Sequence, residues 1–297
     1  MIHKILVPSG IGDFSWTWSK FVTTGDQYHI EYAGGEPDRM KAYLNLLSKD
    51  KILSFGPNSQ YHTMWNKHVK PIELICKSRN PSVYSNRTKM VKYCQLNNGA
   101  STFVESNTFL EDGNRLELWL KDEIPTTDFH YKIEGALTKS TKANYFIVNF
   151  SSYGTKKAWG YYDVSISADV VQDIVKKTNW IPVFVGGYYD DYTNDIHVEL
   201  LKRNIQAISL VGRTPDLLCV IALLQQSKMY FGACSGLMVL ANVLYTPVCC
   251  YYPPFNEPPG RKLAGTWHDP NIPYLSLFWE GKETDIEKMQ QFLKDIK

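Results

Sequence analysis

The chain has 297 residues, a length that favours two domains of ordinary size, and 44% of these residues are apolar, which is enough for sizeable cores. The formal net charge of +2 argues against nucleic acid as a partner. The six cysteines lack CxxC spacing, which favours reduced thiols over a disulfide framework or a zinc site. Because no apolar run has the length of a membrane span, we expect a soluble cytoplasmic protein.

The first predicted strand, Ile2–Pro8, leads into the turn Ser9-Gly10-Ile11-Gly12-Asp13 and then into the predicted helix FSWTWSKFV. Gly10 and Gly12 permit a tight loop close to a ligand, although the third glycine of the dinucleotide fingerprint is missing. Asp13 has two interpretations: it caps the helix, or it is a carboxylate at the carboxyl end of a strand, where open α/β sheets place their chemistry.

Aromatic residues follow both this turn and later strands. Trp16 follows Asp13 by three residues, and an aromatic face suits the apolar face of a sugar ring. Phe14 and Trp18 on either side of it have helical spacing, which favours a core position for these two residues. Three tyrosines after predicted strands are further candidates for stacking on a base or a sugar: Tyr153, Tyr188 and Tyr189.

The rest of the chain alternates between strands and helices, with a polar, basic segment at Lys139–Lys142 that we take as the domain boundary. In the first domain, residues 1–142, we predict further strands at Tyr28–Ala33 and Lys51–Phe55 and a helix at Met40–Leu47. In the second domain, residues 143–297, the predicted strands are Tyr145–Asn149, Ile181–Val185, Ala207–Val211, Met229–Ala233 and Val248–Tyr252. The predicted helices are Val164–Lys176, Asp195–Arg203, one opened by Thr214-Pro215-Asp216, Leu237–Leu244 and Asp285–Lys297.

Such alternation predicts an α/β fold, with a doubly wound parallel sheet in each half and a ligand cleft between two Rossmann-like domains. The last helix either stays with the second domain or crosses back to the first. The turn Cys234-Ser235-Gly236 lies between a buried strand and the helix that begins near Leu237. Unpaired N–H groups and the helix dipole make such a turn an anion site. It is also compatible with one more structural βαβ unit.

Three stretches carry a resemblance to a known family: SGIGD after the first strand, FSSYGTKKAW in mid-chain, and LVGRTPDLL…YFGACSGLMVLANVLYTPV. Together they resemble the GT-B fold glycosyltransferases, in particular the heptosyltransferase-like family nine. The stronger part of the match runs from about Tyr145 to Pro254. The resemblance implies an inverting, metal-independent transfer from a nucleotide-diphosphate sugar, with the donor on the second domain, the acceptor on the first, and no cofactor.

The resemblance also implies roles for individual residues. Asp13 falls on the family's general base, with Gly10, Gly12 and Trp16 on the acceptor side. The lysine near the donor diphosphate falls on Lys157, with Lys156 as an equal rival. On the donor side, the implied residues are Gly187, Arg213, Thr214, Ser235, Gly236 and Leu237. The chain departs from the family at two positions, because Cys234 stands where the family usually has Asp and Val239 where it usually has His.

The sequence therefore predicts a glycosyltransferase of the hexosyl or heptosyl type that moves a sugar from a nucleotide sugar to a glycan or another hydroxyl acceptor. Two alternatives stay open. One is a nucleotide-sugar epimerase of the same fold, which would need additional acid and base groups. The other is a catalytically weak protein that binds sugar nucleotides, an interpretation motivated by Cys234 and Val239.

Overall fold

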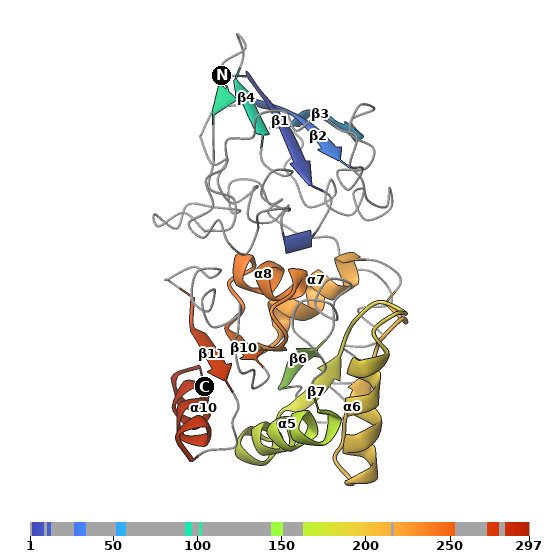
Figure 1. The fold of residues 1–297 in the computed structure, drawn as a ribbon, viewed down its shortest axis with the longest axis vertical. Helices are drawn as coiled ribbons and strands as arrows, with labels where there is room; N and C mark the ends of the chain where they lie inside the picture. Colours follow the sequence, from blue (N-terminus) through green and yellow to red (C-terminus); the bar gives the residue numbers. More distant parts are fainter. Residues whose placement is uncertain are drawn as a thin grey trace. The chain divides into compact units, whose positions relative to one another are not determined.

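The computed structural model describes residues 2–8, 11–12, 27–33, 52–57, 93–96, 101–102, 144–150, 163–214, 217–252, 272–278 and 283–296. The chain divides into two compact units, Met1–Ile124 and Pro125–Lys297. The predicted boundary at residue 142 lies outside the described residues and stays a prediction. Each unit contains its own sheet (Figure 1).

The N-terminal unit has a five-stranded sheet in the order β3-β2-β1-β4-β5. Its strands are β1 (Ile2–Pro8), β2 (Gln27–Ala33), β3 (Ile52–Pro57), β4 (Tyr93–Leu96) and β5 (Ser101–Thr102). The three strands predicted in this half are confirmed, and they pair in parallel. The helix predicted at Met40–Leu47 lies outside the described residues.

The prediction that this sheet is entirely parallel is wrong. β4 runs antiparallel to β1, and β5 runs antiparallel to β4. The connection between β4 and β5 is Asn97-Asn98-Gly99-Ala100, which is rich in turn-forming residues and too short for a parallel crossover. A short connection of this composition favours two antiparallel strands, so the sheet of the N-terminal unit is mixed.

The C-terminal unit has a six-stranded sheet in the order β11-β10-β9-β6-β7-β8, and all of its strand pairs are parallel. The strands are β6 (Tyr145–Asn149), β7 (Ile181–Phe184), β8 (Ile208–Ser209), β9 (Tyr230–Gly232), β10 (Val248–Tyr252) and β11 (Tyr274–Phe278). All five predicted strands of this half are confirmed, and β11 is an addition. Near-continuous apolar strands buried on both faces are typical of such a sheet.

Helices cover both faces of this sheet (Figure 1). Helices α5 (Val164–Thr178), α6 (Asp191–Lys202) and α10 (Glu283–Asp295) share one hydrophobic cluster with alternate strand residues such as Phe146 and Val148. Helices α7 (Leu217–Gln226) and α8 (Gly236–Val243) lie on the other face. The predicted doubly wound α/β architecture is therefore confirmed for this unit.

Two details of the predicted helices are wrong. Helix α6 begins at Asp191 and not at Asp195, because the chain turns at Asp190, whose backbone carbonyl accepts from Asn194 N at 3.3 Å. An acidic residue in the first turn suits the helix dipole. In α5, the spacing of Ile166, Val170 and Ile174 predicts one buried apolar stripe, but Ile166 is exposed, whereas its neighbour Ser167 is buried.

Candidate functional site

The winding of the C-terminal sheet reverses at one position, between β6 and β9. From β6 the chain proceeds outward through β7 and β8, and it then returns to the other side of β6 to form β9 and β10. In open α/β sheets, ligands bind at the carboxyl ends of the strands where the winding reverses in this way. The carboxyl ends of β6 and β9, at Asn149 and Gly232, therefore mark the candidate site.

The turn after β9 leads directly into α8 at this position. Ser235 is the N-cap residue in an extended conformation, with φ −139° and ψ 175°, and its side chain makes no capping hydrogen bond. Gly236 and Leu237 form the start of the helix, and both are half-buried. The first-turn N–H groups of a helix have no acceptor within the helix itself. Together with the positive end of the helix dipole, they can bind an anion.

Gly232 allows β9 to approach β6 closely. Its φ of +152° disfavours any residue with a side chain. A Cβ atom at this position would lie 1.8 Å from the backbone carbonyl oxygen of Asn149. Both reasons require glycine, and the close approach fixes the turn after β9 against the end of β6.

The Ser235 hydroxyl contacts protein groups below the turn. Its Oγ lies 3.1 Å from the Tyr230 hydroxyl and 3.5 Å from Asn149 Oδ1. The Tyr230 hydroxyl also lies 2.9 Å from the carbonyl oxygen of Ala233 and 3.1 Å from that of Asn149. Burial raises the pKa of Tyr230 well above its usual value, so the phenol stays protonated, and the two carbonyl oxygens share its single O–H donor. This leaves the backbone N–H groups of Gly236 and Leu237 as the groups of the turn that an anion could contact.

Asn149 connects this turn to the loop after β7. Its Nδ2 donates to the carbonyl oxygen of Val185 at 2.9 Å and to Asp190 Oδ2 at 3.4 Å. The same carboxylate oxygen accepts from the backbone N–H of Gly187 at 2.9 Å. A buried polar network thus runs from Ser235 through Asn149 and Asp190 to Gly187. We call it the strand-end network.

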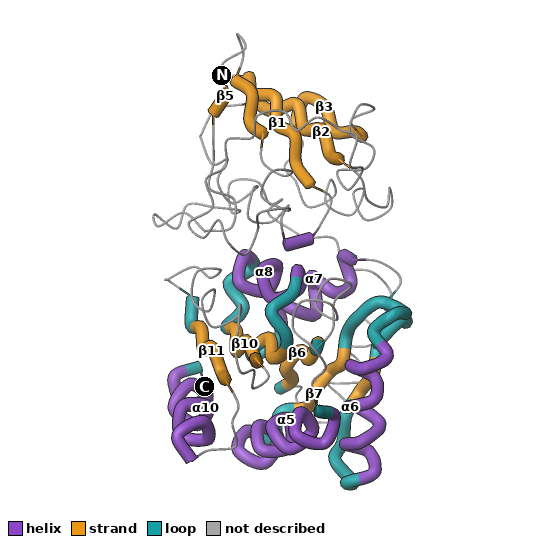
Figure 2. Tube along the Cα trace, in the orientation of Figure 1, coloured by secondary structure: helices purple, strands orange, loops and turns teal. Residues whose placement is uncertain are grey.

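The loop after β8 packs against the loop after β7, and Figure 2 shows the two loops side by side. Gly212 N donates to the carbonyl oxygen of Gly186 at 3.0 Å, and Gly212 has a φ of +66°. The next residue, Arg213, is exposed, and Thr214 is half-buried. The side chain of Arg213 provides positive charge at this edge of the sheet.

The pKa of His197, a residue of α6, depends on its burial and on the positive charge of Arg213. Burial is the main cause that lowers the pKa of His197 below 6.5, and Arg213 lowers it further. A hydrogen bond with the backbone of Ala207 acts in the opposite direction. Half-buried His197 packs edge-on against Phe184, with ring centroids 5.6 Å apart. A neutral imidazole at this position suits its apolar surroundings.

Five of the predicted site residues lie outside the described residues: Asp13, Lys156, Lys157, Gly10 and Trp16. Gly12 is described, and it is buried in a short helical segment of the N-terminal unit. The remaining predicted donor-side residues lie just after the carboxyl ends of β7, β8 and β9, either in the connecting loops and turn or in the first turn of α8: Gly187, Arg213, Thr214, Ser235, Gly236 and Leu237. The structure therefore gathers them at one edge of one sheet.

The sequence does not predict the buried polar residues that hold these segments together, namely Asn149, Asp190 and Tyr230. One signal was present for Asn149, since a polar residue at the end of the apolar run YFIVN is unusual. In the part of the chain that the structure describes, no group of three His, Cys, Asp or Glu side chains could hold a metal ion. The expectation of metal-independent chemistry stays a prediction. Among the same residues, no helix has both the length and the apolar composition that a bilayer crossing requires.

The fold is that of the GT-B glycosyltransferases. A glycosyl transferase family 9 structure from Veillonella parvula superimposes with a TM-score of 0.57 and 12% identity, covering 99% of this chain and 96% of the other. The ADP-heptose lipopolysaccharide heptosyltransferase II of E. coli gives a TM-score of 0.55 with 13% identity, covering 100% and 98% of the two chains.

An enzyme of the other predicted class is also similar in fold. The UDP-GlcNAc 2-epimerase of Methanocaldococcus jannaschii gives a TM-score of 0.50 with 10% identity, covering 99% of this chain and 92% of the other. Neither a protein-family model nor a curated protein sequence matches the chain. The shared property is therefore the fold, and the activity must be argued from the site.

Proposed function

We propose that the chain is an inverting, metal-independent glycosyltransferase that moves a sugar from a nucleotide-diphosphate sugar to a hydroxyl acceptor. The observation that carries this proposal is the start of helix α8, which lies at the reversal of strand order and is held there by Gly232 and the strand-end network. The first-turn N–H groups at Gly236 and Leu237 would bind the diphosphate. Similar structures that include an ADP-heptose transferase support this assignment.

The same N–H groups would also assist the chemistry. Negative charge grows on the leaving diphosphate during transfer, and oriented N–H groups stabilise such charge without having to reorganise. In this proposal Lys157 or Lys156 and the exposed Arg213 add positive charge to the same end of the donor. Cys234 and Val239 are both buried, so we expect the backbone to make most of the diphosphate contacts.

The acceptor would bind to the N-terminal unit, with Asp13 as the base that takes the proton of the attacking hydroxyl. The Asp13→Asn variant keeps the size and most of the capping capacity of the side chain but removes the base. We expect transfer to fall by roughly 10²- to 10⁴-fold, the usual contribution of a positioned acid or base. Donor affinity should hardly change. Transfer at the wild-type rate would restrict Asp13 to the role of a helix cap.

A panel of ADP-, UDP- and GDP-sugars tests the overall proposal. We first measure thermal stabilisation by the three nucleoside diphosphates, since a ligand at 100 times its Kd adds about 2.7 kcal/mol. We then follow each donor by NMR with a set of glycan acceptors. Formation of a new glycosidic linkage supports transfer, and a donor epimerised without acceptor identifies an epimerase. Binding without turnover identifies a sugar-nucleotide-binding protein, whereas no stabilisation by any nucleotide would contradict all three functions.

A further inference from the structure

An exposed aromatic side chain lies at the same edge of the C-terminal sheet and takes no part in the strand-end network. Among the large hydrophobic residues that the structure describes, Tyr188 has the greatest exposed fraction, 85%, followed by Leu201 at 49%. Tyr188 directly follows Gly187 in the loop after β7. A tyrosine ring that the fold does not bury is available for a ligand.

The backbone around this ring is nevertheless fixed. Gly187 N donates to Asp190 Oδ2, and Asp190 N donates back to the carbonyl oxygen of Gly187 at 3.0 Å. From the loop after β8, Gly212 packs so closely that a Cβ there would lie 3.1 Å from the Cα of Tyr188. The ring is thus presented to solvent from a backbone that is held on both sides.

The neighbouring ring of Tyr189 leaves part of this surface open. The centroids of the two rings are 5.3 Å apart, and their planes are inclined by 79°. In an edge-to-face pair, at least one face of each ring is not covered by its partner. Tyr188 therefore retains a free face of the kind on which planar, π-rich groups stack.

The position of Tyr188 relative to the start of helix α8 indicates which part of a nucleotide could stack on the tyrosine ring. β9 and β7 are the two neighbours of β6, so their carboxyl ends lie two strand spacings apart, on the order of 10 Å. The strand-end network spans this distance from Ser235 to Gly187. A diphosphate at the start of α8 would have its nucleoside within reach of the loop after β7.

We propose that Tyr188 stacks on the base of the donor nucleotide. This inference rests on the proposed function. Stacking on an aromatic ring tolerates every base, because each base has a π-face. Tyr188 would then contribute affinity for the nucleoside part of the donor and none for the phosphates.

Calorimetric titration of the full chain with ADP, UDP and GDP, with the three matching nucleosides and with inorganic pyrophosphate separates these contributions. Tyr188→Ala should weaken the nucleoside diphosphate and its nucleoside alike, by roughly 5- to 150-fold, the effect of losing one stacked base. Pyrophosphate binding should not change. Tyr188→Phe keeps the ring and should bind within about twofold of the wild type. The control is Tyr245→Ala, which removes a partly exposed ring between α8 and the amino end of β10 and should change nothing.

The outcomes separate this inference from the function on which it rests. If the wild type binds none of ADP, UDP and GDP, the proposed function and the stacking role both fail. If the wild type binds one of them and Tyr188→Ala binds it equally well, the stacking role is wrong and the function stands. An equal loss of pyrophosphate binding would show a disturbed loop, and an equal loss in Tyr188→Phe would assign the effect to the hydroxyl. Either of these two results overturns stacking.

Discussion

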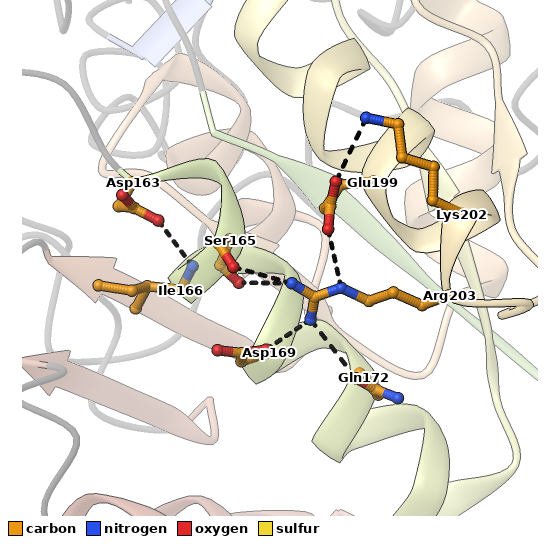
Figure 3. A network of polar contacts seen from close by, with 8 residues as sticks. All are labelled: Asp163, Ser165, Ile166, Asp169, Gln172, Glu199, Lys202 and Arg203. Atoms are coloured by element: carbon orange, nitrogen blue, oxygen red, sulfur yellow. Dashed lines mark hydrogen bonds and ion pairs between the residues drawn. The ribbon is translucent and has the colours of Figure 1, made fainter.

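Two polar networks hold parts of the C-terminal unit together, and they differ in burial. In the network between α5 and α6, the Arg203 guanidinium donates to Asp169, Glu199 and Ser165 (Figure 3). The side chain of Asp169 in this network is 57% exposed. In the strand-end network, by contrast, Asn149 and Asp190 are almost fully buried.

This difference in burial indicates which of the two networks contributes more to the free energy of unfolding. An ion pair in water is screened and replaces good contacts with water, so a surface pair adds 0 to about 1 kcal/mol. A buried amide that loses its partner cannot return to water, and each unsatisfied group costs about 1–3 kcal/mol. The strand-end network therefore ties the positions of the loops after β7 and β9 to the stability of the sheet. The Arg203 network joins two helices and contributes little to the free energy of unfolding.

The largest loss of stability is expected at Gly232, where β9 packs closely against the end of β6. Gly232→Ala places a methyl group 1.8 Å from the Asn149 carbonyl oxygen and requires an unfavourable φ. We expect a loss of more than about 4 kcal/mol, at the extreme of what single substitutions do. Chemical denaturation measures it, with Gly56→Ala as the matched control, because an added Cβ at Gly56 would meet no atom within 4 Å. Equal stability of the two variants would contradict the close approach.

A smaller loss is expected on removal of the amide that joins the loops. Asn149→Ala leaves the Val185 carbonyl and the Asp190 carboxylate without the Nδ2 donor, so we expect a loss of about 2–4 kcal/mol. Nucleoside diphosphate affinity should fall as well, because the loops after β7 and β9 lose their connection. A double-mutant cycle with Asp190→Ala should give a coupling energy of at least about 0.5 kcal/mol. Strict additivity would disprove the network.

Substitution in the Arg203 network should reduce the free energy of unfolding much less. Arg203→Gln removes the guanidinium that contacts α5, and we expect a loss of at most about 1 kcal/mol because solvent screens these charges. The difference from wild type should shrink further in about 1 M salt. Nucleotide affinity should stay the same. A loss as large as that of Asn149→Ala would reverse the comparison between the two networks.

The smallest effect concerns pH. Because the pKa of His197 is lowered in the folded state, the unfolded chain binds more protons between this pKa and about 6.5. The free energy of unfolding should therefore decrease as the pH falls through this window, and His197→Gln should reduce the slope. Arg213→Gln should raise the pKa of His197 in an NMR titration, since the Arg213 charge lowers it. If the pKa of His197 stays unchanged in Arg213→Gln, the charge of Arg213 does not act on His197.

Much of the C-terminal unit could be predicted from the sequence because its strands are short, continuous apolar runs between glycines and helix caps. The turn at Ser235 and Gly236 was predictable for the same reason, since a buried strand directly precedes an apolar helix. The antiparallel strand β4 was missed because its four residues, YCQL, show no clear alternation. The start of α6 was misplaced because several capping residues, from Asp190 to Asp195, compete in the sequence.

The strand-end network could not be predicted, because its members are distant in sequence. Asn149 lies 41 residues from Asp190 and 86 residues from Ser235. Only the strand order brings these side chains together, and no local sequence pattern predicts that order. The need for glycine at residue 232 has the same origin, since the atom that excludes a side chain there belongs to Asn149.

The central claim is that the start of helix α8 binds the diphosphate of a nucleotide. Amide NMR of the ¹⁵N-labelled chain tests it directly, with titrations of ADP or UDP and of the matching nucleoside. We predict that the Gly236 and Leu237 amides shift with the nucleoside diphosphate and hardly respond to the nucleoside. Saturable binding of the nucleoside diphosphate that leaves both amides unshifted would contradict the account.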